Sequence, residues 1–163
     1  MFKQVQAPDE FDEHQRSIFL AGSIDNGNAI DWQQNLIKFI GQKKVTYPYE
    51  ETLILNPRRL DWDKEWSPTL DNFNFLEQVE WETKGLETAD FIALNLTPNS
   101  VSPISLLELG AYLRNKGRNS LVCCSSDYFR VGNVEFFCRK NEIPFTKNLE
   151  DFYNSVKYWC YYG

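Results

Sequence analysis

The chain has 163 residues, of which 42% are hydrophobic and 25% charged, and its formal net charge is −6 with a single histidine. This length and composition are typical of one globular domain that can bury a proper core. The acidic balance argues against a general nucleic-acid binder, which needs a basic surface, and leaves a small molecule as the expected partner.

Targeting and metal-binding patterns are not found in the sequence. No apolar run approaches the length that spans a membrane and no signal peptide opens the chain, so we expect a cytoplasmic protein without membrane contacts. The four cysteines include the adjacent pair Cys123 and Cys124 but no Cys-x-x-Cys spacing. We therefore expect reduced thiols in the core and no metal site.

The start of the chain predicts an arm, a strand and a loop. Residues 1–16 are polar, with one proline and no clear period, and predict an irregular arm ahead of a single domain at residues 17–163. Residues 17–21 predict the first strand, and the loop at 22–28 lacks the G-x-G-x-x-G spacing of a dinucleotide site. A helix with one apolar stripe follows, and Trp32 near its start is interpreted as a packing residue rather than a wall for base stacking.

An unusual loop follows the second predicted strand, which covers residues 52–56. The loop at residues 58–68 is charged and bears tryptophans, so it is too polar for a core. One interpretation is a solvated connection. The other is a flap over the substrate, in which Arg58 or Arg59 grips a phosphate and Trp62 helps to sandwich a base.

The middle of the chain predicts a helix, a buried strand and a second helix. Residues 72–88 predict a helix whose acidic residues mostly face solvent. Residues 91–96 predict a strand covered on both faces, because their run is nearly continuous in apolar residues. A polar loop leads to a helix predicted over residues 104–116 and ended by Gly117. One residue of this helix, Glu108, does not fit its apolar surroundings.

Taken alone, Glu108 is most simply a solvated helix carboxylate. Leucines on both sides leave few polar neighbours for a free surface charge, however, and Gly110 lets a ligand approach the helix closely. The helix also begins at the carboxyl end of a strand, where open α/β sheets bind ligands. A carboxylate in an apolar setting suits nucleophilic or acid–base chemistry at a glycosidic bond.

The remaining elements complete an alternating pattern. An apolar run near Cys123 predicts a strand, and a helix at 129–141, a short strand at 143–145 and a closing helix at 148–162 follow. Five strands that alternate with helices predict an α/β fold, a three-layer sandwich with a flavodoxin-like five-stranded parallel sheet and helices on both faces.

Four stretches of the chain resemble the nucleoside 2-deoxyribosyltransferase family. They correspond to its first strand and base-binding loop, its central strand, its signature helix and a sugar-contacting loop. They are, in that order, residues 18–23, 86–98, 107–117 and 127–133. The resemblance extends over roughly residues 17 to 140.

The resemblance implies catalytic and substrate-binding residues. It makes Glu108 the nucleophile and Glu82 the acid that handles the proton on the base, with Glu80 as the alternative if the register slips. Glu82 is one methylene longer than the family's aspartate, and Ser102 stands where the family has a second aspartate that contacts the sugar. Asn133 matches an asparagine near the sugar. The expected substrate-binding residues are Phe19, Gly22, Ser23, Arg58, Trp62, Ser102 and Asn133.

The implied reaction passes through a covalent deoxyribosyl ester on Glu108, which a second nucleobase takes up in transfer or water in hydrolysis. It needs no metal or organic cofactor. The expected partners are a nucleoside or nucleotide, a free nucleobase and, from the family, further copies of the chain in a homo-oligomer. In that oligomer the aromatic end of the chain either reaches a neighbouring site or packs on its own sheet. Three alternatives stay open: hydrolysis of deoxynucleoside 5′-monophosphates, cleavage of the nicotinamide bond in NAD, and binding of a nucleotide or NAD-derived ligand without catalysis.

Overall fold

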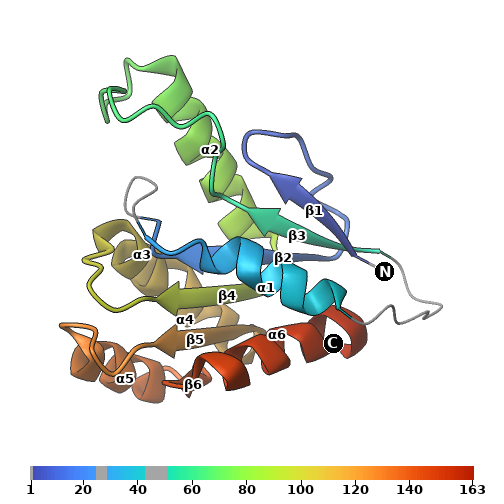
Figure 1. Cartoon of the computed structure of the whole chain (residues 1–163), viewed down its shortest axis with the longest axis vertical. Helices are drawn as coiled ribbons and strands as arrows, with labels where there is room; N and C mark the ends of the chain where they lie inside the picture. The colour runs from blue at the N-terminus through green and yellow to red at the C-terminus, as the bar shows by residue number, and fades with distance from the viewer. Residues whose placement is uncertain (1, 25–28, 43–50) are drawn as a thin grey trace.

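A computed structural model describes residues 2–24, 29–42 and 51–163, and in this part of the chain six parallel strands form one sheet (Figure 1). The strands are β1 (Phe2–Gln6), β2 (Ser17–Gly22), β3 (Thr52–Asn56), β4 (Phe91–Leu96), β5 (Ser120–Cys124) and β6 (Phe145–Thr146). Their order across the sheet is β1-β3-β2-β4-β5-β6. Every pairing is parallel.

Helices cover both faces of the sheet. One face carries α1 (Trp32–Gly41) and α6 (Leu149–Tyr162), which lie in front of the sheet in Figure 1 and share one hydrophobic core. The other carries α2 (Phe73–Thr88), α3 (Pro103–Glu108) and α5 (Val131–Lys140). Three short turns follow α3: the π-helical η2 (Leu109–Leu113), α4 (Arg114–Lys116) and the 3₁₀ turn η3 (Gly117–Asn119). The predicted three-layer α/β fold is therefore confirmed.

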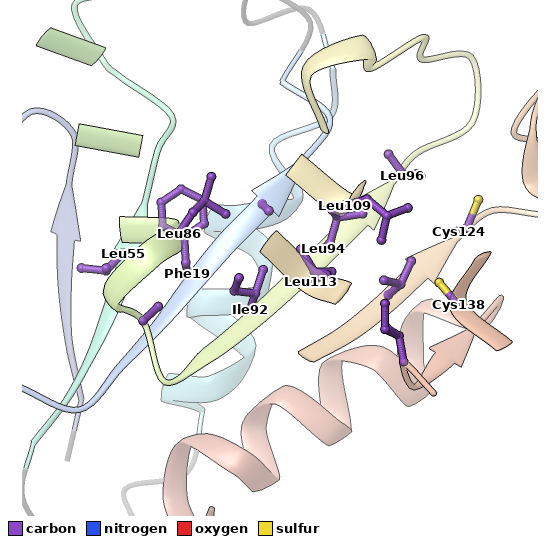
Figure 2. Close-up of a cluster of buried hydrophobic side chains, with 14 of the residues drawn as sticks. Phe19, Leu55, Leu86, Ile92, Leu94, Leu96, Leu109, Leu113, Cys124 and Cys138 are labelled. Atoms are coloured by element: carbon purple, nitrogen blue, oxygen red, sulfur yellow. The ribbon is translucent and has the colours of Figure 1, made fainter. Parts of the chain in front are cut away.

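The central strands form because their residues are apolar on both faces. All the residues of β3, β4 and β5 are buried, as are five of the six in β2. Figure 2 shows the core on the α2 and α3 face, where Phe19, Leu94 and Leu109 are among the packed side chains. Continuous apolar runs of this kind are the signature of a parallel sheet covered by helices.

The sheet has one strand more than predicted. β1 lies within the segment expected to be an irregular arm, and it pairs with β3 from Phe2↔Thr52 to Gln6↔Asn56. Only Val5 of β1 is fully buried, so the strand carries no apolar run that would reveal it in the sequence. Its partner strand, rather than its own composition, determines its conformation.

The rest of the presumed arm packs against α2. The indole Nε1 of Trp81 donates a hydrogen bond to the backbone oxygen of Asp9 at 2.8 Å. The rings of Phe11 and Trp81 meet edge to face with their centroids 5.4 Å apart. Residues near the start of the chain therefore support the helix that carries Glu82.

The five strands other than β1 have a flavodoxin-like order, which contains a switch point between β2 and β4. From β2 the chain adds β3 on one side, and later β4 and its successors on the other. The helices that follow β2 and β4 lie on opposite faces of the sheet. In sheets of this order, ligands bind at the carboxyl edge near the switch point. Gly22 ends β2 with φ of +134°, and a Cβ atom there would collide with the backbone oxygen of Asn95 in β4.

Within the described residues, no helix combines the length and the apolar character needed to cross a lipid bilayer.

Candidate active site

Glu108 is the last residue of α3, and only 9% of it is exposed. Burial penalises its charged form, and the charge of Glu82 adds to this effect, so that the pKa of Glu108 rises to about 8. Neighbouring Leu109 packs into the core. A solvated helix carboxylate does not fit this burial.

Glu82 lies in α2 and also has a raised pKa, about 7. Burial is the main cause, and a hydrogen bond from the side chain of Gln78 opposes it in part. Glu80, two residues earlier, is exposed to solvent. The helix therefore turns Glu82, and not Glu80, toward the interior.

The two glutamates come from different elements, and the charge of Glu82 raises the pKa of Glu108. Because both pKa values lie near neutrality, the pair retains roughly one proton between its two carboxyl groups in that range. With one proton on the two groups, one carboxyl group is ionised and the other protonated, and the higher pKa of Glu108 places the proton mainly there. This is the combination that nucleophilic attack with protonation of a leaving group requires.

The helix that carries Glu108 changes its geometry directly after it. Residues Leu109–Leu113 form a π-helical turn, which contains Gly110. Leu109 and Leu113 are both buried, whereas Gly110 is exposed. Single π-helical turns within α-helices are rare and occur often at functional sites.

Three serine hydroxyls join the loops after β2 and β4. The Oγ atoms of Ser23 and Ser102 lie 2.7 Å apart, and Ser100 is hydrogen-bonded to Ser102. The Ser23 Oγ also accepts a hydrogen bond from the backbone N–H of Thr97 at 3.1 Å. All three serines are buried. Hydroxyl groups both donate and accept, so this cluster can meet the hydroxyls of a sugar.

The backbone at Ser102 is unusual for a residue with a side chain. Its φ of +43° and ψ of +53° place it in the left-handed region, immediately before α3 begins. Such conformations cost free energy and are found preferentially at functional sites. The cluster of serines and the start of α3 are therefore held together by a strained residue.

Of the other predicted site residues, Phe19 lies beneath the surface. Phe19 is 1% exposed, and its ring packs against Trp81 with a centroid distance of 6.0 Å. A Cβ atom at Gly85 would collide with this ring. Phe19 therefore supports the helix that carries Glu82.

Arg58 lies in the loop after β3, and its side chain reaches the residues that precede α1. Its guanidinium donates to the backbone oxygens of Ala29 and Ile30, at 3.0 and 3.3 Å, and its Nε lies 3.5 Å from the Asp31 carboxylate. Each of these contacts involves the segment that precedes α1. The guanidinium of Arg58 therefore contacts the residues just before α1, at the carboxyl edge of the sheet.

Trp62 and Asn133 are not joined to the glutamate pair by any contact of the described residues. Trp62 packs edge to face on Trp66 at 5.2 Å, in the loop between β3 and α2. Asn133 is exposed in the first turn of α5. The structure thus places Glu82 within electrostatic reach of Glu108 and joins Ser23 to Ser102.

Arg59 organises the loop between β3 and α2. Its side chain is only 4% exposed and forms ion pairs with Asp61 and Glu77, each with a closest distance of 2.8 Å. Its guanidinium also lies 5.1 Å from the centroid of the Trp66 ring. In Figure 1 this loop and the start of α2 project beyond the sheet. Arg59 therefore fixes a projecting loop to α2.

Two residues near the site were missed by the sequence analysis. Ser100 belongs to the serine cluster, and Gln78 donates a hydrogen bond to Glu82. Gln78 precedes Glu82 by four residues in the same helix, a spacing that places both on one face. This spacing was the available signal, but it becomes informative only once Glu82 is known to face inward.

A hollow lies at the amino edge of the sheet, away from the loops that follow β2 and β4. It has a volume of about 550 Å³, and Arg16, Asp90 and Lys116 line it. Arg16 donates to the backbone oxygen of Trp159, and Lys116 to that of Ala89, so both cations cap helix ends. Among the residues that the structure describes, no group of three or more His, Cys, Asp or Glu side chains is placed to hold a metal ion.

A comparison with protein families gives one match. The model of a family described as nucleoside 2-deoxyribosyltransferase like matches residues 15–128. This interval includes Glu82, Glu108 and the three clustered serines, and it ends before Asn133. No curated protein matches the chain.

Proposed function

Because the chain belongs to the nucleoside 2-deoxyribosyltransferase-like family, we propose that it cleaves the N-glycosidic bond of 2′-deoxynucleosides and transfers the sugar to another nucleobase. The observation that carries this proposal is the pair of carboxyl groups of Glu82, which is half-buried, and Glu108, which is buried. Their pKa values are raised to about 7 and about 8, and each lies in an element within the matched interval. Surface carboxylates would not share a proton near neutral pH.

In the first half of the reaction, the Glu108 carboxylate attacks the anomeric carbon as the bond to the base breaks. The proton shared by the pair passes to the departing base, with Glu82 as the donor. Because Glu108 has the higher pKa, the proton rests mainly on Glu108 before the reaction and must move to Glu82 first. The products are a neutral base, a deoxyribosyl ester on Glu108 and an ionised Glu82.

In the second half, a ring nitrogen of the incoming base attacks the same carbon and the ester bond breaks. Ionised Glu82 accepts the proton that this nitrogen releases, which restores the pair with one proton. Two successive displacements retain the configuration at the anomeric carbon. If water replaces the base, the same steps hydrolyse the nucleoside.

The serine cluster favours a second candidate, hydrolysis of deoxynucleoside 5′-monophosphates. Ser102 stands where the family's sugar-contacting aspartate is expected, and its hydroxyl is paired with the hydroxyls of Ser23 and Ser100. A group of neutral hydroxyls does not repel a phosphate as a carboxylate would. This candidate uses the same two glutamates.

The test of the proposed function is an incubation with each 2′-deoxynucleoside and its 5′-monophosphate, with and without a second free base. Chromatography identifies the products. A new nucleoside that forms only with the second base establishes transfer, whereas free base with deoxyribose or its phosphate establishes hydrolysis. Ribonucleosides and NAD serve as the ribose counterparts.

Two variants make this test specific. Glu108→Ala removes the proposed nucleophile and should abolish product formation. Glu87→Gln neutralises an exposed carboxylate in α2 and should leave it unchanged. If wild type and Glu108→Ala yield the same products at the same rate, or neither acts on any substrate, the proposed function is wrong and binding without catalysis becomes the better interpretation.

A further inference from the structure

The amide of Gln78 is fixed in one orientation. Gln78 is 5% exposed, and its Nε2 atom donates two hydrogen bonds of 2.8 Å each, to the Glu82 Oε1 and to the backbone oxygen of Pro57. The backbone oxygen of Pro57 can only accept, so the amide nitrogen must face it. Nitrogen, and not oxygen, therefore also faces Glu82.

This arrangement distinguishes the two oxygens of the Glu82 carboxyl group. Oε1 accepts the N–H of Gln78, so a proton bound by the carboxyl group resides on Oε2. We propose that Gln78 is a positioning residue that anchors Glu82 to the end of β3 through Oε1 and thereby makes Oε2 the proton-donating atom. This role rests on the proposed function, because it matters only if Glu82 protonates a departing base.

A purely structural role explains Gln78 less well. Its own oxygen, Oε1, is buried and accepts no hydrogen bond from any described residue. A methionine would fill the same volume without leaving a buried polar atom without a partner. What the amide adds is the pair of donated hydrogen bonds, and one of them ends on the proposed acid.

The charged groups around the pair do not compete with this role. Arg58 is paired with Asp31, and Arg59 with Asp61 and Glu77. Glu80 on the same helix is exposed. Among the described residues, the group that shifts the pKa of Glu108 is Glu82, and the group that shifts the pKa of Glu82 is the amide of Gln78.

Loss of the amide has two expected effects. A hydrogen bond donated to a carboxylate favours its ionised form, so without the amide Glu82 releases its proton at a higher pH. The pH–rate profile should move upward by about half a unit. A carboxyl group that is free to rotate should also donate its proton less often, which lowers kcat about tenfold with little change in KM.

The experiment compares wild type with Gln78→Met and with the control Gln34→Met. Gln34 is a half-buried glutamine of α1 whose side chain contacts Gln4 rather than a glutamate. Each protein is assayed across pH 5 to 9.5 on deoxynucleosides. In parallel, carbon NMR follows the titration of the Glu82 carboxyl group, which needs no substrate and is assigned by its loss in Glu82→Gln.

The inference is supported if Gln78→Met, and not Gln34→Met, has a lower kcat and an upward shift of both the pH–rate profile and the Glu82 titration. An unchanged NMR titration of Glu82 overturns the inference. A lower kcat with an unchanged pH–rate profile also overturns it, because a change in packing alone would explain that result. If wild type is inactive on every substrate, the proposed function fails and the NMR titration still decides whether Gln78 controls Glu82. If Gln78→Met does not fold, Gln78→Asn, whose amide is too short to span both acceptors, replaces it with the same expectations.

Discussion

Glu82 and Glu108 hold their protons more tightly than ordinary carboxyl groups, because burial disfavours their charged forms. We expect kcat to depend on pH as a bell with its maximum between about 7 and about 8. On the acid side both carboxyls are protonated and no nucleophile is ionised. On the alkaline side no proton remains for the departing base. Rates measured from pH 5 to 9.5 check this.

A substrate with a different leaving group provides the control for this prediction. A deoxyribosyl donor whose leaving group departs without protonation should lose the alkaline limb and keep the acid one. A rate that rises steadily with pH for an ordinary nucleoside would contradict the assignment of a protonated acid.

The same burial makes the folded protein less stable as pH rises. The pKa of Glu108 is near 4.5 in an unfolded chain and about 8 in the folded one. The folded state therefore binds the proton more tightly, and stability is lost progressively as pH rises from about 4.5 through about 8. Glu108→Gln cannot ionise, so it should gain stability relative to wild type, on the order of 4 kcal/mol at pH 9 compared with pH 5.

Urea unfolding at pH 5, 7 and 9 measures this difference. Glu87→Gln, which changes an exposed carboxylate in α2, should show no comparable trend. Parallel stability curves for wild type and Glu108→Gln would mean that Glu108 ionises as easily in the folded protein as in the unfolded one.

At the scale of secondary-structure elements, the loop between β3 and α2 depends on one buried cation. Arg59→Met removes the ion pairs with Asp61 and Glu77 and leaves those carboxylates without their cation. We expect the free energy of unfolding to fall by about 1–3 kcal/mol. We also expect faster hydrogen exchange in residues 58–71, measured by mass spectrometry.

Arg118→Met is the matched control, because Arg118 is exposed at the far edge of the sheet. It should leave exchange in residues 58–71 unchanged. Equal exchange in Arg59→Met and wild type would show that the tryptophans, and not Arg59, hold the loop.

Some elements could be predicted from the sequence and others could not. The strands β2 to β5 were predictable because they are apolar on both faces. β1 was not predicted because its sequence is polar and its partner β3 is distant in the chain. The π-helical turn after Glu108 escaped because a short apolar run does not reveal which hydrogen bonds its backbone forms.

The site residues also divide into those that could be predicted from the sequence and those that could not. Glu108 could be singled out because it interrupts an apolar run, and Glu82 followed only from a family resemblance. Its inward direction, and the exclusion of Glu80, needed the packing of α2. The contact of Ser23 with Ser102 joins loops from two strands and has no local signal at all.

At the scale of the whole molecule, apolar side chains are exposed in the segment that carries Glu108. Val101, Ile104 and Leu107 are 62%, 60% and 67% exposed, around and within α3. Contiguous exposed apolar groups indicate an interaction surface. We expect the protein to form a homo-oligomer through this surface, and Leu107→Glu to dissociate it.

Light scattering coupled to size-exclusion chromatography measures the oligomeric state. Leu149→Glu, at the start of α6 on the other face of the sheet, is the control and should not change it. A monomeric wild type would contradict this prediction, and so would an intact oligomer of Leu107→Glu.

The purely parallel sheet also determines when the chain can fold. The partners of β2 are β3 and β4, which are separated from it by whole helices and loops. During synthesis on the ribosome, β2 therefore has no strand to pair with until residues 52–56 have emerged. Its second neighbour, at residues 91–96, emerges later still. Each pairing closes a long loop, and such contacts of high sequence separation slow folding to milliseconds or longer. During synthesis the apolar central strand is therefore exposed, and unpaired apolar strands of this kind favour aggregation until their partners arrive.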